Sequence, residues 1–248
     1  MDEISGFFAQ AEVSGQPETL ELLSRSEAGF SELYRARKEG RFRVYECLKP
    51  EFRGDPLYEG LLRKEFEIGY SLGHPNICEF YEYLPVAALG NCIEMEWVDG
   101  CTLDRLLEQG RVDAPLARKL AREICDALAY MHAKQVLHRD LKPSNVLVTY
   151  NGHNVKLIDF GLSDSDGHAV LKQAAGTARY AAPELLNGGP VDNRADIYSL
   201  GEMLSPLPVR RCVANRCRAR NCIVWSSGRT GSKAPSICGS TRLCGGCP

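Results

Sequence analysis

The sequence predicts an α+β fold in which a β-rich part precedes a helical part. Strand patterns fill Leu20–Tyr83 except for one helical stretch at roughly Tyr58–Leu72, and a further apolar strand follows at Cys92–Val98. Helical patterns then take over at Thr102–Gln109 and Ala114–Lys134. Because the strands come first and the helices later, the order indicates separate β and α parts rather than alternating βαβ units.

The helix predicted at Ala114–Lys134 has one apolar face. Its apolar side chains recur every three or four residues, at Leu116, Leu120, Ile124, Leu128 and Met131. This spacing returns each side chain to the same side of a helix, so we expect one buried stripe.

Two short apolar strands follow that helix, at Val146–Thr149 and Val155–Ile158. Between them stands Asn151-Gly152, a pair that favours the backbone conformation of a tight hairpin turn. The pattern therefore predicts a β-hairpin.

The composition is that of an ordinary globular protein. Aromatic residues make up 8% and charged residues 25% of the 248 residues, which is typical of such proteins. No apolar run approaches the ~18 residues of a membrane span, and the first residues lack the basic and apolar regions of a secretory signal. We therefore expect a cytoplasmic protein with no membrane partner.

The charge changes abruptly near residue 205. Residues 205–248 hold eight Lys and Arg residues and no Asp or Glu, whereas residues 1–204 hold 22 basic and 32 acidic residues. The same tail carries six of the eleven cysteines, at Cys212, Cys217, Cys222, Cys238, Cys244 and Cys247. The chain thus has two different compositions.

Three interpretations of this tail compete. Cys244 and Cys247 have the spacing of zinc ligands, but a zinc site normally needs a second pair at similar spacing, and the tail has no His. Its charge would suit nucleic acid, yet Trp225 is its only aromatic side chain that could stack on bases. The tail also lacks acids and apolar periodicity, which favours out-of-frame or otherwise non-native sequence, disordered and without a core.

Four polar residues form the most informative set in the chain. Asp140, Lys142 and Asn145 lie within six residues, and Asp159 follows Asn145 by fourteen. Phosphoryl transfer needs a carboxylate to accept the hydroxyl proton, a cation beside the moving phosphoryl group, and oxygen ligands for magnesium. This set supplies all three.

With their flanks, these residues resemble a serine/threonine protein kinase of bacterial type. The block His138–Asn145 resembles the catalytic loop of that family, and Leu157–Gly161 resembles its magnesium motif. Further on, Gly176–Glu184 resembles the end of an activation segment, and Asp196–Gly201 the start of the central helix of the large lobe.

The resemblance covers roughly Leu20 to Leu204 and implies a bilobal kinase-like fold. A lead-in at 1–19 would precede a β-rich small lobe at 20–98. A helical large lobe at 99–204 would follow, and it would be incomplete because the basic tail at 205–248 replaces the helices that this lobe normally contains.

The resemblance also implies a role for each catalytic residue. Asp140 would be the catalytic base, Lys142 would contact the γ-phosphate, and Thr177 would hydrogen-bond to both. Asn145 and Asp159 would hold Mg²⁺.

ATP would bind between the two lobes. Met95 would be the gatekeeper, the backbone of Glu96 and Val98 would bond the adenine edge, and Leu147 would form the floor. Glu65 corresponds to the glutamate of helix αC, which normally pairs with a lysine of the third strand.

The loop that covers the phosphates departs from the family pattern. Kinases place three glycines there, because their missing side chains let backbone N–H groups approach the phosphates. In this chain the segment reads Ser26, Glu27, Ala28, Gly29, Phe30, Ser31. The glycine positions fall on Ser26, Ala28 and Ser31, or on Ser24, Ser26 and Ser31 with a two-residue insertion. Small side chains weaken this approach without blocking it.

The third strand departs further. The alignment puts Glu46 where the ATP-binding lysine belongs, so that Glu46 and Glu65 would bring like charges together, which would raise one pKa or push the two side chains apart. Lys49 is the nearest cation, but three residues along a strand place it on the opposite face, so it could substitute only if the strand were bulged or shifted. We therefore expect a damaged ATP site.

The best interpretation is a kinase that uses ATP and Mg²⁺ to phosphorylate Ser or Thr hydroxyls of a protein substrate. The alternative is a catalytically impaired pseudokinase that acts as a nucleotide- or protein-binding regulatory module, as Glu46 and the altered loop suggest. Nucleic-acid binding through the tail ranks third. The sequence does not predict the substrate or the oligomeric state.

Overall fold

The structure is a computed structural model, which describes residues 17, 19–25, 29–160, 179–205 and 207. All of them belong to one compact unit, Met1–Val209, and a second unit comprises Arg210–Pro248. Of the predicted site residues, Ser26, Ala28 and Thr177 lie outside the described residues, as do nearly all of the lead-in and the basic tail.

The β-rich part is a five-stranded antiparallel sheet in the order β1-β2-β3-β5-β4. Its strands are β1 (Glu21–Arg25), β2 (Ser31–Lys38), β3 (Arg41–Leu48), β4 (Phe80–Val86) and β5 (Gly90–Glu96). The pairings β1–β2 and β4–β5 each contain an irregularity, whereas β3 pairs in unbroken register with both of its neighbours. The strands predicted before residue 98 are confirmed.

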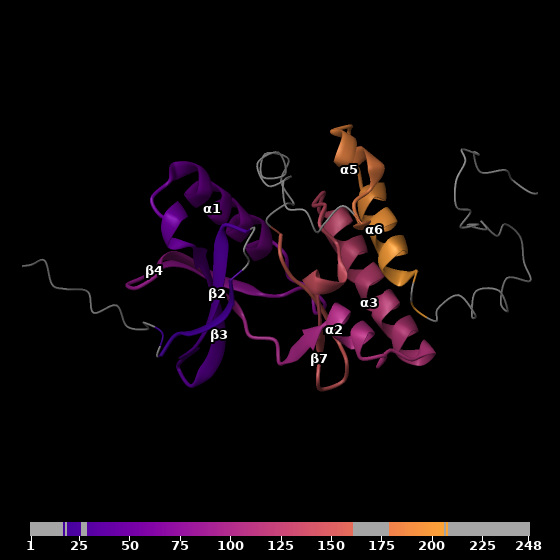
Figure 1. The fold of residues 1–248 in the computed structure, drawn as a ribbon, viewed down its shortest axis with the longest axis horizontal. Coiled ribbons are helices and arrows are strands. Elements are labelled where there is room, and N and C mark those ends of the chain that lie inside the picture. The colour runs from indigo at the N-terminus through magenta and orange to yellow at the C-terminus, as the bar shows by residue number, and fades with distance from the viewer. Residues whose placement is uncertain (1–16, 18, 26–28, 161–178, 206, 208–248) are drawn as a thin grey trace, which may run out of the picture. The chain divides into compact units, whose positions relative to one another are not determined.

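Helix α1 (Pro56–Tyr70) lies between β3 and β4 in the chain, after the short helix η1 (Pro50–Phe52), and it packs against the sheet (Figure 1). Asp55 caps its start, since its Oδ1 accepts a hydrogen bond from the N–H of Leu57 at 2.8 Å, and Pro56 occupies the first helical position. Such a cap stabilises a helix by about 1 kcal/mol. The helix predicted at Tyr58–Leu72 is confirmed, but it begins and ends two residues earlier.

The two faces of the sheet bury different cores. On β3, Val44 and Leu48 join the large core that continues into the helical part. Tyr45 and Cys47, which alternate with them, join a smaller cluster on the other face. Since neighbouring residues of a strand point to opposite faces, Glu46 shares the inner face with Val44 and Leu48.

Among the residues that the structure describes, the helical part combines four α-helices with a small second sheet. The helices are α2 (Leu103–Glu108), α3 (Ala114–Ala133), α5 (Pro183–Asn187) and α6 (Arg194–Leu204), and η2 (Pro143–Asn145) is a short 3₁₀ turn. The sheet has the order β6-β7-β8, formed by β6 (Gly100–Thr102), β7 (Val146–Thr149) and β8 (Val155–Leu157). The predicted hairpin is confirmed as the antiparallel pair β7–β8.

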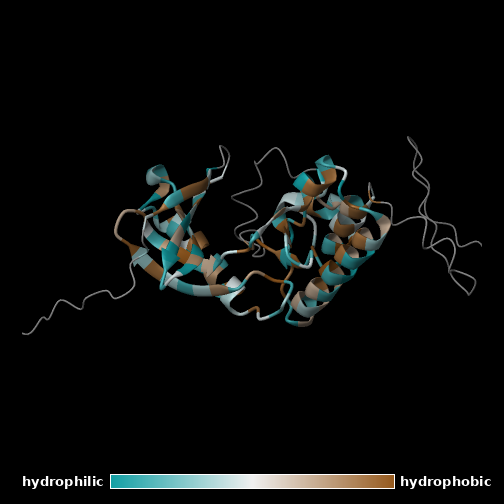
Figure 2. Cartoon of the chain, turned by 90° about the horizontal axis from the view of Figure 1, so that it is seen from below, coloured by the Kyte–Doolittle hydropathy of each residue, from teal (hydrophilic) through white to brown (hydrophobic). Residues whose placement is uncertain are grey.

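The long helix α3 confirms the predicted stripe. Leu120, Ile124, Leu128 and Met131 are fully buried, and Leu116 packs on the same core as a partly buried residue. Figure 2 shows the helices brown on one side and teal on the other, as expected when one face is buried. No helix in the described part of the chain is long and apolar enough to cross a membrane.

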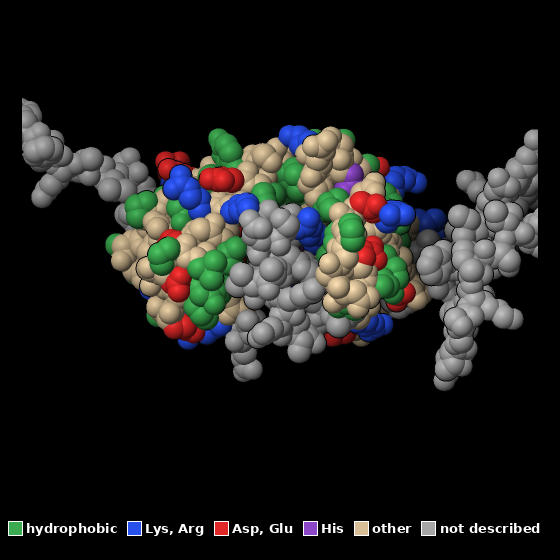
Figure 3. Space-filling model, turned by 90° about the horizontal axis from the view of Figure 1, so that it is seen from above, with side chains coloured by type: hydrophobic (Ala, Val, Ile, Leu, Met, Phe, Trp, Pro, Cys, Tyr) green, Lys and Arg blue, Asp and Glu red, His purple; other side chains and the backbone are tan. Residues whose placement is uncertain are grey.

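The outer surface is mixed in charge. The face shown in Figure 3 carries Lys and Arg side chains interspersed with Asp and Glu, with hydrophobic side chains between them. Among the described residues, ion pairs join Arg35 with Glu21 and Lys38 with the buried Glu94. The more exposed Arg35–Glu21 pair adds little stability.

Candidate active site

The loop before β7 gathers Asp140, Lys142 and Asn145 into one hydrogen-bonded group. Asp140 is 5% exposed, and its Oδ2 lies 2.6 Å from Nζ of Lys142. The Asn145 Nδ2 donates to Asp140 at both the backbone oxygen (3.0 Å) and Oδ2 (3.1 Å). Among the described residues, Asp140 Oδ1 is buried with no hydrogen-bond partner. Hydrogen bonds therefore hold the Asp140 carboxylate through Oδ2, while no described residue uses Oδ1 as an acceptor.

Asp196, in the first turn of α6, fixes the backbone of this loop. It is fully buried, and its carboxylate accepts hydrogen bonds from the backbone N–H groups of His138 (3.0 Å) and Arg139 (2.8 Å). Its Oδ2 also lies 2.7 Å from Nε2 of His132 on α3. Burial alone would raise the pKa of Asp196, but the hydrogen bond to His132, the nearby His138 and the two backbone donors hold it below its usual value. The loop is thus tied to both α3 and α6.

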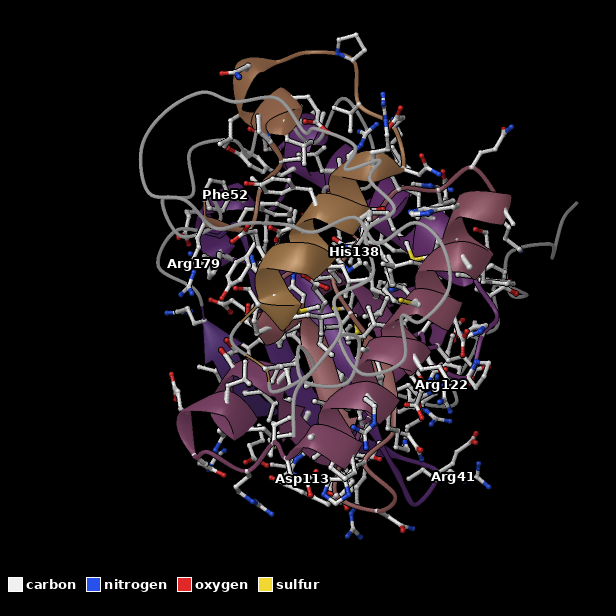
Figure 4. The ribbon with its side chains drawn as sticks, turned by 90° about the vertical axis from the view of Figure 1, so that its right-hand side faces the viewer. Arg41, Phe52, Asp113, Arg122, His138 and Arg179 are labelled. Carbon is white, nitrogen blue, oxygen red and sulfur yellow. The ribbon has the colours of Figure 1, made fainter. Side chains whose placement is uncertain are left out.

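A row of aromatic rings crosses from the sheet to this loop. Phe160 is fully buried, and its ring centroid lies 5.7 Å from that of Phe80 on β4 and 5.6 Å from that of His138. A Cβ added to Gly69 of α1 would come within 2.7 Å of the Phe80 ring, so only glycine leaves room there. Figure 4 shows His138 in the interior behind α6, while Arg41, Asp113 and Arg122 lie at the edge of the view.

Asn145 and the segment that carries Asp159 are joined by a backbone hydrogen bond. The N–H of Ile158 donates to the backbone oxygen of Asn145 at 3.1 Å, which places the end of β8 beside the loop that contains Asp140. Asp159 has a left-handed backbone (φ 67°) and an exposed side chain. The Asn145 side chain donates to Asp140 through its Nδ2 group, whereas its Oδ1 is the atom that can accept a hydrogen bond or bind a cation. Carboxylate and amide oxygens of this kind suit Mg²⁺.

Glu46 occupies the slot on β3 that the sequence assigned to it. Its partly buried carboxylate is hydrogen-bonded by the side chain of Ser31, at the start of β2. Burial raises the pKa of Glu46 to about 7, Ser31 opposes this shift, and the charge of Asp159 adds to it. The pKa of Glu46 is thus raised as predicted, but burial is the main cause, and the acidic neighbour that adds to it is Asp159 rather than Glu65.

The carboxylate of Glu65 instead reaches the segment after β8. Glu65 is 4% exposed, and its Oε1 accepts a hydrogen bond from the backbone N–H of Phe160 at 3.1 Å. Helix α1 is therefore connected directly to the residue that follows Asp159.

Lys49 lies immediately after β3 and is 6% exposed. Its backbone N–H donates to the oxygen of Phe30 at 2.9 Å, next to Gly29 and Ser31 of the predicted phosphate loop. The bulge that would turn Lys49 to the inner face is absent, because the β3 register with β2 and β5 is unbroken. The role of Lys49 as a phosphate ligand stays a prediction.

The predicted adenine-binding residues lie at the end of β5, in the connection that follows it, and on β7. Met95 and Val98 are buried, and Leu147 on β7 is partly buried. The backbone N–H of Glu96 donates to the oxygen of Glu79 at 2.8 Å, and its side-chain Oε2 lies 2.7 Å from Nζ of Lys156 on β8. Among these residues, the backbone of Val98 remains the best candidate for a hydrogen bond to adenine.

Sequence reasoning missed several residues that organise the site. Asp196 was noted as the start of a helix but not as the anchor of the catalytic loop, and the Phe80–Phe160 contact and the Ser31–Glu46 hydrogen bond were not foreseen. The available signal for Asp196 is an acid in the first turn of α6, within the block Asp196–Gly201 that resembles the central helix of the large lobe.

Comparison with known proteins agrees with this geometry. A family profile described as the protein kinase domain matches residues 29–220. A probable serine/threonine-protein kinase of Streptomyces coelicolor is 36% identical over 191 residues, covering 72% of this chain and 28% of that protein. The serine/threonine-protein kinase PknB of Mycolicibacterium smegmatis is 35% identical over 191 residues, covering 71% and 30%.

A eukaryotic protein kinase is similar to this chain as well. Aurora kinase B of Danio rerio is 35% identical over 175 residues, covering 69% of this chain and 54% of that protein. The chain thus spans about a third of the length of the two bacterial relatives and about half of this one.

Proposed function

Because the chain belongs to the protein kinase domain family, we propose that it transfers the γ-phosphoryl group of ATP to Ser or Thr hydroxyls of a protein substrate. The observation that carries the proposal is the Asp140 group. Its carboxylate is held by Lys142 and Asn145 through Oδ2, while Oδ1 keeps its acceptor capacity among the described residues.

This arrangement suits a base that accepts the proton of a substrate hydroxyl. The free lone pairs of Oδ1 would receive the hydroxyl hydrogen, and the Lys142 ammonium group, 2.6 Å from the other oxygen, would face the phosphoryl group that moves. The Asp196 hydrogen bonds keep the loop backbone in place while this occurs.

Asn145 and Asp159 would hold Mg²⁺. The amide oxygen of Asn145 and the exposed carboxylate of Asp159 are hard oxygen ligands, so these residues fit the ion. When bound, magnesium would neutralise negative charge on the phosphates.

The β3 side of the nucleotide site fits less well. Glu46 faces the same region as Asp159, so two acids meet where the family normally sets a lysine against phosphate. We therefore expect weak nucleotide binding. This feature also supports the second candidate function, a catalytically impaired pseudokinase that regulates a partner. A cytoplasmic location and a soluble protein substrate complete the proposal.

Phosphoryl transfer to generic acceptors such as casein, measured with radiolabelled ATP on the full chain, separates the two functions. A kinase would show slow transfer that Asp140→Asn abolishes, because the amide is a far weaker base. A pseudokinase would show no transfer, although ATP would still raise its melting temperature. Transfer that survives Asp140→Asn would contradict the assigned role of Asp140.

A further inference from the structure

Cys47 and Cys92 stand opposite one another on neighbouring strands. Cys47 of β3 is the register partner of Cys92 of β5, and both side chains belong to the small cluster on the outer face of the sheet. Residues directly opposite in an antiparallel pair have Cα atoms ~4.5–5.5 Å apart, within the range that a disulfide spans. Both cysteines are buried, and neither forms a disulfide in the structure.

The two thiols interact and differ in character. Each side chain hydrogen-bonds to the other. The hydrogen bond from Cys92 is the main cause that lowers the pKa of Cys47, and the guanidinium of Arg53 lowers it further. The same hydrogen bond and burial raise the pKa of Cys92. The pKa of Cys47 is therefore lowered, although burial opposes this shift, and the pKa of its neighbour Cys92 is raised.

Arg53 is held where it can act on Cys47. Its Nε donates to the oxygen of Leu48 at 2.9 Å, and its NH1 donates to the oxygen of Ala88 at 3.2 Å. These bonds join the end of β3 to the β4–β5 turn and keep the cation close to both strands. Redox-active cysteine pairs likewise combine a thiol of lowered pKa, a nearby cation and a second thiol. Here both thiols are buried, so a small oxidant such as hydrogen peroxide must enter the cluster to reach them.

We propose that Cys47 and Cys92 form a reversible disulfide that responds to hydroperoxides. The Cys47 thiolate attacks one oxygen of hydrogen peroxide, which yields a sulfenic acid and a hydroxide ion that takes up a proton as water. The Cys92 thiol then attacks the sulfenic sulfur, and the S–S bond forms as a second water leaves. The two thiols lose two electrons, and one peroxide is reduced to two waters.

The bond would join β3 to β5 on the face opposite Glu46. The cross-link is independent of the proposed kinase activity, because neither cysteine belongs to the Asp140 group. Closing a loop of about 45 residues (47 to 92) restricts the unfolded chain, so the oxidised protein should melt at a higher temperature than the reduced one.

Mass spectrometry of the full chain after brief hydrogen peroxide treatment tests the proposal. The protein is alkylated and digested without reduction, so that each cysteine is located by peptide mass. We expect a Cys47–Cys92 linked peptide that dithiothreitol removes. Cys92→Ser should instead leave Cys47 as a sulfenic acid that dimedone traps.

Two controls sharpen this test. Cys78 is equally buried, but burial raises its pKa to about 12, so Cys78→Ser should leave the Cys47–Cys92 link unchanged. Arg53→Met should slow link formation several-fold by removing the cation. A wild-type protein in which Cys47 stays reduced while Cys78 oxidises, or in which Cys47 links mainly to another cysteine, would overturn the proposal.

Discussion

The carboxylate of Glu65 accepts a hydrogen bond from the backbone N–H of Phe160 at 3.1 Å, and both groups are buried. This bond spans 95 residues of sequence and joins helix α1 to the segment that carries Asp159. In an active kinase the corresponding glutamate pairs with a lysine of β3, a position that Glu46 occupies in this chain. Here the helix is positioned through the backbone of the segment that we propose to hold magnesium.

The first prediction concerns this bond. Glu65→Ala should lower the free energy of unfolding by about 1–3 kcal/mol, because it leaves the buried N–H of Phe160 without its acceptor. Glu65→Gln keeps a carbonyl oxygen at the same position and should cost less. Urea denaturation of both variants provides the measurement, and equal losses would show that the charge of Glu65 matters more than its hydrogen bond.

Magnesium should act through Asp159. Asp159→Asn should leave the melting temperature of the nucleotide-free protein equal or higher, because the side chain is exposed, Asn tolerates the left-handed backbone, and repulsion from Glu46 falls. The same variant should lose the additional thermal shift that Mg²⁺ gives to ATP. A full magnesium response in Asp159→Asn would rule out this residue as a ligand.

Glu46→Lys should strengthen ATP binding. The substitution places a cation on the inner face of β3, opposite Asp159, where phosphate charge is expected. Affinity should rise about tenfold for each ~1.4 kcal/mol gained, as measured by calorimetric titration with MgATP.

Two variants distinguish the reasons for such a gain. Glu46→Gln removes the repulsion without adding a cation, so it should give only part of the improvement. Lys49→Met keeps the buried stem of Lys49 and should change ATP affinity little, because the regular β3 strand favours the opposite face for this side chain. Loss of all nucleotide binding in Lys49→Met would instead identify Lys49 as the phosphate ligand.

The sequence predicted local features well and distant contacts poorly. Helix α3 was predictable because its apolar spacing is written into twenty consecutive residues, and the Asp140–Asn145 group because its members lie within six residues. Three interactions of the site join residues far apart in the chain. Asp196 bonds to His138, Phe80 packs on Phe160, and Glu46 interacts electrostatically with Asp159. No local periodicity specifies such pairs, so their geometry emerges only once the sheet and helices pack together.

Asp196 should be a main source of stability and of its dependence on pH. The folded pKa is lower than the unfolded one, so the charged carboxylate stabilises the fold at all pH values above the unfolded value near 3.9. This stabilisation is lost as the pH falls through the lowered folded pKa. Asp196→Ala should cost about 3 kcal/mol at pH 7, since it leaves two buried N–H groups without acceptors.

The matched variant Asp196→Asn keeps one acceptor oxygen and should cost less at pH 7. It should also remove the part of acid destabilisation that comes from this carboxylate. Denaturation midpoints between pH 3 and pH 7 would reveal both effects, and a parallel pH profile in wild type and Asp196→Asn would show that the carboxylate does not contribute.

The last prediction places the end of the folded unit. The change in composition lies at residue 205, yet Leu207 is 4% exposed and its N–H donates to the oxygen of Leu204 at 3.0 Å. The compact unit extends to Val209. A chain ending at Val209 should therefore keep the melting temperature and ATP response of the full chain. A chain ending at Leu204 should melt at a lower temperature, since burying a Leu side chain contributes about 1.5–3 kcal/mol.

Two outcomes would contradict this boundary. Equal melting of the two shortened proteins would place it at residue 205. Stoichiometric zinc in the full chain, lost with folding on chelation, would make the tail a metal-binding module.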